Sequence, residues 1–174
     1  MRRDSVPAMY RLLVAICLGA LAGFGCSGAP GGPSNLNKID DPLQVQPEVS
    51  PVVSSDILAR EPVANNTQVK HILIGWADSA DDSHRDPRAA KRTKKDAEDT
   101  VRDLLKQIAN GADFDALMKQ YSEDPGSAGN AKAYPVAPDA SLVIEFKQLG
   151  LRLKINEIGV VQSEYGFHIM KRIE

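Results

Sequence analysis

Two segments of the chain combine apolar side chains with the β-branched residues that favour strands. The first, Val69 to Trp76 (VKHILIGW), is typical of a strand buried on both faces. The second, Phe167 to Ile173 (FHIMKRI), has the same character, and Val160 to Gln162 forms a shorter apolar stretch just before it. We therefore expect one strand near the start of a domain and two strands at its end.

Between these strands the apolar positions follow a helical period. One stripe lies on a single helix face and consists of Ala97, Val101, Leu104, Leu105 and Ile108. Asp86 and Pro87 are expected to open this helix, and Gly111 to end it. Two shorter helices follow, one opened by Asp113 and the other by Asp139. The order strand, helix, helix, loop, helix, strand, strand predicts a small α+β domain over residues 67–174.

The amino-terminal segment has the pattern of an export signal. Basic residues precede an apolar run from Leu12 to Phe24, which is too short to span a bilayer of roughly 30 Å and predicts a signal peptide over residues 1–25. The small residues that lead into Cys26 resemble the lipobox of bacterial lipoprotein precursors. That resemblance implies a lipid anchor on Cys26 and a place on the outer membrane, facing the periplasm. The alternative is an ordinary signal peptide beside an idle thiol.

Residues 26–66 are expected to form a disordered tether between this anchor and the domain. Six of the eleven prolines of the chain fall there, together with several glycines. Such a segment buries too little apolar surface to offset the entropy lost on ordering. Only Ser55 to Arg60 is expected to form a turn of helix.

Composition excludes several classes of function. The net charge is -2 and aromatic residues make up 5% of the chain, which argues against nucleic-acid binding. Both cysteines lie within the first 26 residues, so the domain has no thiol pair for redox chemistry or metal binding. The three histidines lack the spacing of a metal site, and no phosphate-binding glycine loop occurs. We expect a monomer that needs no metal and no cofactor.

Four segments in order resemble the parvulin-type peptidyl-prolyl isomerase family. They are VKHILI, IANGADFDALMKQYSEDPGS, LVIEF and NEIGVVQSEYGFHIMKRIE. The resemblance implies the FKBP-like superfold, a four-stranded antiparallel sheet with about four surrounding helices and two histidine-bearing strands at its centre. It also implies an enzyme that rotates X-Pro peptide bonds in unfolded or extended polypeptides and so assists folding of secreted or envelope proteins.

The same resemblance assigns a polar catalytic network. His71 and His168 correspond to the paired histidines of the family, whose rings hydrogen-bond across the sheet. Asp124 stands where the family has cysteine or aspartate, and Ser163 stands where a threonine usually bonds a histidine. Ser122 matches the serine after the second helix and is expected to help bind the substrate. Two roles stay open for the histidines, which either take part in catalysis or mainly fix the sheet and place Asp124.

The substrate pocket follows the family less closely. Phe146 corresponds to the phenylalanine that stacks on proline, and Leu142 replaces the usual methionine. Tyr134 falls on the position of a pocket leucine, within a segment, Ala131 to Val136, that lacks two glycines of the family. A remodelled pocket would suit a second hypothesis, a tethered peptide-binding chaperone with little isomerase activity. A third, a purely structural envelope lipoprotein, requires the histidine pattern to be accidental.

A basic cluster follows the first strand, where some parvulins recognise phosphoserine. It comprises Arg85, Arg88, Lys91, Arg92, Lys94 and Lys95. Four acidic residues share the segment and oppose its field, namely Asp78, Asp81, Asp82 and Asp86. The lysines and Arg92 are typical of a solvated helix face. We therefore expect a bulky apolar residue before proline to be preferred, with Tyr134 and Leu142 contacting it, and no gain from phosphate.

Overall fold

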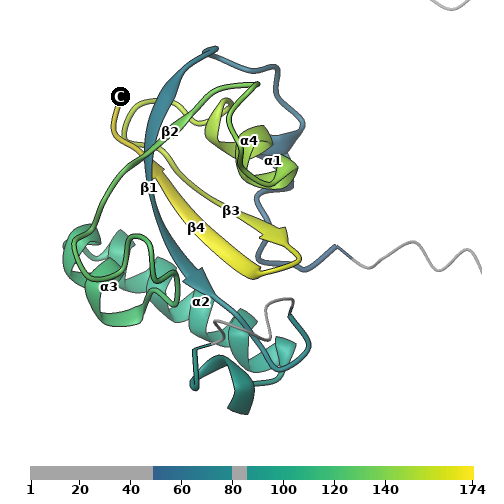
Figure 1. Ribbon diagram of the computed structural model, residues 1–174, viewed down its shortest axis with the longest axis vertical. Helices are drawn as coiled ribbons and strands as arrows, with labels where there is room; N and C mark the ends of the chain where they lie inside the picture. Colours follow the sequence, from purple (N-terminus) through teal and green to yellow (C-terminus); the bar gives the residue numbers. More distant parts are fainter. Residues whose placement is uncertain (1–48, 80–85) are drawn as a thin grey trace, which may run out of the picture. The chain divides into compact units, whose positions relative to one another are not determined.

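A four-stranded antiparallel sheet forms the centre of the domain (Figure 1). The computed structural model describes residues 49–79 and 86–174. The strands are β1 (Thr67–Ile74), β2 (Tyr134–Val136), β3 (Ile158–Ser163) and β4 (Gly166–Arg172), in the spatial order β2-β1-β4-β3. The two histidine-bearing strands are therefore adjacent at the centre, and the α+β fold expected from the sequence is confirmed.

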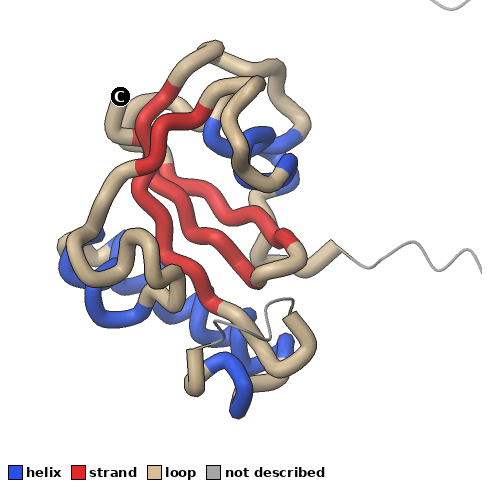
Figure 2. The backbone as a smooth tube through the Cα atoms, in the orientation of Figure 1, coloured by secondary structure: helices blue, strands red, loops and turns tan. Residues whose placement is uncertain are grey.

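Helices cover both faces of this sheet (Figure 2). Within the described residues they are α1 (Ser55–Leu58), α2 (Lys94–Ala109), α3 (Phe114–Tyr121) and α4 (Ile144–Gly150), with a single 3-10 turn, η1 (Ala89–Lys91). Apolar residues of α2 and α3 pack on one face, and those of α1 and α4 pack on the other. No helix in this part of the chain is long and apolar enough to cross a membrane.

Strand alternation divides the central residues between the two faces. Ile72 and Ile169 point to the α2 and α3 side, where they join the larger apolar cluster. In the β1–β4 register His71 lies opposite Met170, and Leu73 lies opposite His168. Both histidines consequently share the α4 face with Met170. The sheet thus keeps one face for the main core and the other for the polar side chains of interest.

The helix starts differ from two sequence expectations. Helix α2 begins at Lys94 because Thr93 and Asp96 form a reciprocal capping box, whereas Asp86 precedes the separate turn η1. Helix α4 begins at Ile144 after Val143, which makes no side-chain cap, and Asp139 lies outside the helix. In both places the expected aspartate lies in a turn instead of capping the helix.

Residues 49–66 belong to the folded domain and differ from the expected disordered tether. Ser54 donates its backbone N–H to the Val160 carbonyl (2.9 Å), and its hydroxyl accepts the Val160 N–H (2.9 Å). Val52 is buried in the cluster of α2 and α3, and Ile57 in that of α4. This segment therefore passes along β3 and covers an edge strand that would otherwise be open. Residues 1–48, including Cys26, lie outside the described residues.

We predict that Ile57→Ala lowers the free energy of unfolding by about 2 to 4 kcal/mol, because Ile57 is 4% exposed and its loss leaves a cavity beside α4. Val63→Ala is the matched control, since Val63 is 48% exposed, and should change stability by less than about 0.5 kcal/mol. Urea unfolding of both variants measures the difference. Equal stabilities would show that the segment does not unfold together with the sheet.

Candidate active site

Two buried histidines lie at the centre of the α4 face. His71 comes from β1 and His168 from β4, and they are 4% and 5% exposed. Their ring centroids are 5.3 Å apart at 66°, an edge-to-face contact. Among the described residues neither Nδ1 has a hydrogen-bond partner, so no hydrogen bond joins the two rings. The structure brings the pair together through packing and not through the bond that the family resemblance implied.

Burial keeps both rings neutral. It lowers the pKa of His71 to about 4, and the nearby Asp124 carboxylate only partly opposes this effect. Burial also lowers the pKa of His168 well below its ordinary value, and the adjacent His71 adds to the effect. Near neutral pH the two imidazoles therefore act as polar, uncharged groups.

Asp124 lies in the loop after α3 and faces His71, with 3.5 Å between its Oδ2 and His71 Nε2. Tyr134 donates its hydroxyl to the same oxygen at 2.9 Å, and Ser127 donates its hydroxyl there as well. The Gly126 N–H donates to Oδ1 at 3.3 Å. Burial and the hydrogen bond to Asp124 raise the pKa of Tyr134 to about 12, so its hydroxyl remains a donor. The carboxylate is thus held in one position by its own loop and by β2.

The two serines assigned from the sequence occupy different environments. Ser163 hydrogen-bonds His168 Nε2 at 2.7 Å and also accepts the Tyr165 N–H at 3.2 Å. Ser122 is buried, and its hydroxyl accepts the backbone N–H of Leu73 at 3.1 Å. Ser163 therefore orients a histidine, whereas Ser122 anchors the loop to β1 and does not line the cavity.

A cavity of about 530 Å³ opens on this face. Its apolar end is lined by Phe146, Leu142 and Tyr134, next to both histidines. Phe146 meets the two imidazoles edge to face, with ring centroids 5.0 Å from His71 and 5.4 Å from His168. This end offers a dry, ring-lined seat of the kind that accepts a small apolar ring.

The segment that departs from the family keeps an unusual backbone path. Ala131 has φ of 52°, in the left-handed region that favours glycine. Outside this segment, in the turn before β3, Asn156 also has a positive φ, of 64°. Gly126 allows the Tyr134 hydroxyl to approach, because a Cβ at position 126 would lie 2.5 Å from that oxygen. Because position 126 has no side chain, the Tyr134 hydroxyl can reach Asp124 while the tyrosine ring lines the open cavity.

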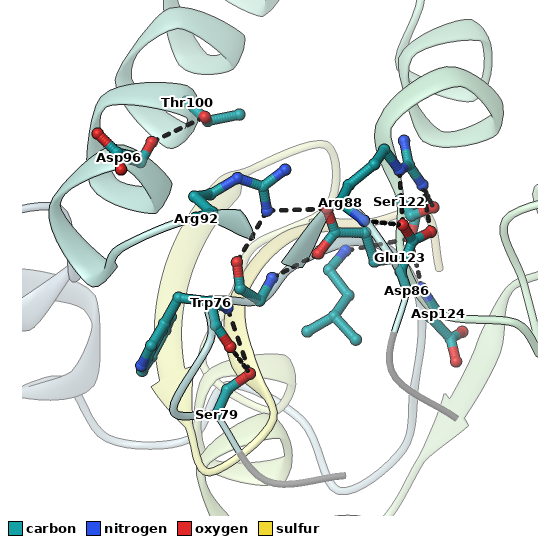
Figure 3. Close-up of polar contacts among 12 residues, drawn as sticks. Trp76, Ser79, Asp86, Arg88, Arg92, Asp96, Thr100, Ser122, Glu123 and Asp124 are labelled. Carbon is teal, nitrogen blue, oxygen red and sulfur yellow. Dashed lines mark hydrogen bonds and ion pairs between the residues drawn. The ribbon is translucent and has the colours of Figure 1, made fainter. Parts of the chain in front are cut away.

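The sequence reasoning missed a buried ion pair beneath the loop (Figure 3). Arg92 Nη1 lies 2.8 Å from Glu123 Oε1, and the two side chains are 16% and 2% exposed. The expectation that Arg92 lies on a solvated helix face is therefore wrong. The SEDPGS sequence places Glu123 beside Asp124, but nothing local indicates its partner across 31 positions.

Two other members of the basic cluster also form ion pairs. Arg88 pairs with Asp86 at 2.8 Å and donates to the carbonyls of Gln120 and Ser122. Lys95 is exposed and pairs with Asp99 one helical turn away. Three further residues of the segment lie outside the described residues, namely Arg85, Asp81 and Asp82.

Comparison with known proteins identifies the family of this domain. Residues 55–174 match the PPIC-type PPIase domain, which is most of the chain. The chain belongs to this family, the parvulins. Of the solved structures, the peptidyl-prolyl isomerase ESS1 from Candida albicans aligns with a TM-score of 0.55 at 16% identity, over 63% of each chain. The solution structure of TbPIN1 aligns with a TM-score of 0.55 at 23% identity, over 64% of this chain and 99% of that one.

Curated relatives share more sequence with this parvulin domain. The chain is 36% identical to the foldase protein PrsA of Geobacillus kaustophilus over 85 residues, which cover 48% of this chain and 30% of the relative. It is 43% identical to the chaperone SurA of Pseudoalteromonas translucida over 75 residues, which cover 42% of this chain and 17% of the relative. The matched region is therefore less than a third of either relative.

We predict that stability falls as the pH is lowered from 7 to 5. An unfolded histidine titrates near pH 6.5, whereas buried His71 titrates near 4, so in this range the unfolded chain binds more protons and gains relative stability. His71 should contribute a loss of about 2 kcal/mol between pH 7 and pH 5 that levels off only near pH 4, and His168 should add a loss of the same sign. Urea unfolding at several pH values measures it. His71→Gln should flatten the slope, and an unchanged slope would contradict the assignment.

Proposed function

We propose that the protein is a peptidyl-prolyl isomerase that assists folding of exported proteins by rotating X-Pro bonds. The observation that carries this proposal is the cavity in which the apolar seat of Phe146 and Leu142 adjoins a fixed carboxylate, Asp124. Membership of the PPIC-type PPIase family supports it. The similarity to proteins named foldase and chaperone supports a role in folding exported chains.

The chemistry requires no bond to be broken. Rotation about the peptide bond has a barrier of about 18 to 20 kcal/mol because resonance gives the C–N bond double-bond character. Lowering that barrier by about 4 kcal/mol accelerates exchange roughly a thousandfold. The enzyme must therefore bind the twisted amide, in which the resonance is lost, better than either planar form.

The site residues divide this task. Phe146 and Leu142 hold the proline ring and exclude water, so the ring stays fixed while the acyl side turns. The carboxylate of Asp124 beside the substrate carbonyl disfavours the resonance form that places negative charge on its oxygen, and so weakens the C–N double bond. His71 and His168 are neutral near pH 7, and their role is to fix the wall of the seat and the position of Asp124.

A peptide-binding chaperone with little isomerase activity is the second candidate. The altered segment from Ala131 to Val136 would favour it if that segment closed the seat. Tyr134 instead lines the open cavity, with its ring centroid 6.1 Å from that of Phe146. This arrangement supports the isomerase, and the assay below separates the two functions.

We also propose that the protein is exported and held on the outer membrane, facing the periplasm, by a lipid on Cys26. The support is the signal-like sequence of residues 1–25 and its small residues before Cys26. An unmodified Cys26 thiol in mass spectra of the mature amino-terminal peptide would overturn the anchor.

The purified protein, with residues 49–174 retained in full, should accelerate cis/trans exchange of a proline peptide without metal or nucleotide, as measured by exchange NMR. Asp124→Ala should lower kcat by about tenfold or more with little loss of stability. Phe146→Ala should mainly raise KM, and Asp99→Asn in the exposed Lys95–Asp99 pair is the control. Peptide binding without acceleration would favour the chaperone. If the protein neither binds the peptide nor accelerates its exchange, both proposed functions are wrong.

We predict a higher kcat/KM for leucine before proline than for glutamate or phosphoserine. The guanidinium groups of Arg88 and Arg92 are occupied by Asp86 and Glu123, and the ionised groups lining the cavity are acidic. A phosphate in the cavity would therefore meet negative charge, because no lysine or arginine is among the described residues that line it. Comparing the three peptides in one exchange assay tests this. An advantage of about tenfold for phosphoserine, or about 1.4 kcal/mol, would refute it.

A further inference from the structure

The loop that carries Asp124 completes the edge of β1. Strand β2 pairs only with Thr67 to Val69, so the rest of that edge needs other partners. The Glu123 N–H donates to the Leu73 carbonyl at 2.9 Å, and the Leu73 N–H donates to the Ser122 hydroxyl. The Gly75 N–H donates to Glu123 Oε2 at 2.7 Å. A side-chain carboxylate thus takes the place of a backbone acceptor at the end of β1.

Arg92 contacts both the end of β1 and Glu123. Its Nη1 donates to the Gly75 carbonyl at 2.8 Å and lies 2.8 Å from Glu123 Oε1. The ion pair therefore engages both backbone groups of one residue that lines the cavity. Figure 3 shows Arg92 reaching toward Glu123, with Arg88 and Ser122 on the far side of that glutamate.

A pair this deeply buried is a weak source of stability. Removing two charges from water costs about as much free energy as their attraction returns. The pair instead fixes the orientation of the carboxylate, because Glu123 Oε2 accepts the Gly75 N–H and Oε1 faces the Arg92 guanidinium as an ion pair. Asp124 is the next residue, and its own N–H lies 3.4 Å from the Ser122 hydroxyl. The position of Glu123 therefore determines where the Asp124 carboxylate meets His71.

We propose that Glu123 and Arg92 are positioning residues of the isomerase site, which act on the reaction through Asp124. The inference rests on the proposed function. Neither side chain needs to contact the peptide. Their effect is to hold the loop so that Asp124 stays between the Tyr134 hydroxyl and His71.

A double-mutant cycle in the full chain tests this inference. Glu123→Gln keeps an acceptor for the Gly75 N–H and removes the charge that binds Arg92, and Asp99→Asn is the matched change in an exposed pair. We expect Glu123→Gln to lower kcat by about fivefold or more, with KM changed by less than about twofold. In an Asp124→Asn background it should cause no further loss. Asp99→Asn should change neither constant.

A second readout follows the position of the carboxylate directly. The ¹⁵N shift of His71 Nε2, which faces Asp124, should move in Glu123→Gln in the same direction as in Asp124→Asn. An unmoved shift, or equal losses of kcat in both backgrounds, would overturn the inference while leaving the isomerase intact. If Glu123→Gln does not fold, Arg92→Lys takes its place in the same cycle. A wild-type chain without isomerase activity would overturn the proposed function and this inference together.

Discussion

The register between β1 and β4 is the constraint on which the site depends. It sets His71 opposite Met170 and His168 opposite Leu73, so both imidazoles emerge on the same face. Side chains alternate along a strand, and a slip of one residue would move one histidine into the apolar cluster of α2 and α3. That cluster consists of apolar and aromatic side chains, so its packing disfavours a slip that would disturb the other face. The larger apolar cluster and the site therefore lie on opposite faces of one sheet.

Burial of the histidine pair has a cost that the surrounding residues limit. Each Nδ1 is buried without a hydrogen-bond partner among the described residues, a loss of about 1 to 3 kcal/mol apiece. Ser163 satisfies the remaining nitrogen of His168, and Phe146 packs against both rings. The result is a rigid, uncharged wall beside a fixed carboxylate. Such a wall suits a reaction that needs an ordered environment and no proton transfer.

The sequence correctly predicted the features that depend on the local spacing of apolar residues, namely the main strands and helices. The apolar, β-branched segments that form β1 and β4, together with the apolar stripe of α2, predicted the fold class. The predicted start of α2 was wrong because Asp86-Pro87 and Thr93 both resemble helix starts. Thr93 is the true cap, and only its reciprocal hydrogen bonds with Asp96 distinguish it. Contacts between distant segments left no such local signal. Ile57 joins the α4 cluster from a proline-rich segment, and Arg92 finds Glu123 across the domain.

Tyr134 shows how the pocket keeps its shape without the glycines of the family. Ala131 holds a left-handed backbone at a cost of about 1 to 2 kcal/mol, so neighbouring contacts must fix the segment in that path. The bond of the Tyr134 hydroxyl to Asp124 supplies one, and the pairing of Tyr134 to Val136 with β1 supplies others. The same ring lines the seat beside Phe146. The Tyr134 side chain therefore restrains a strained loop, orients the Asp124 carboxylate and forms a wall of the cavity. The sequence change in the loop and the changed shape of the site thus depend on the same residue.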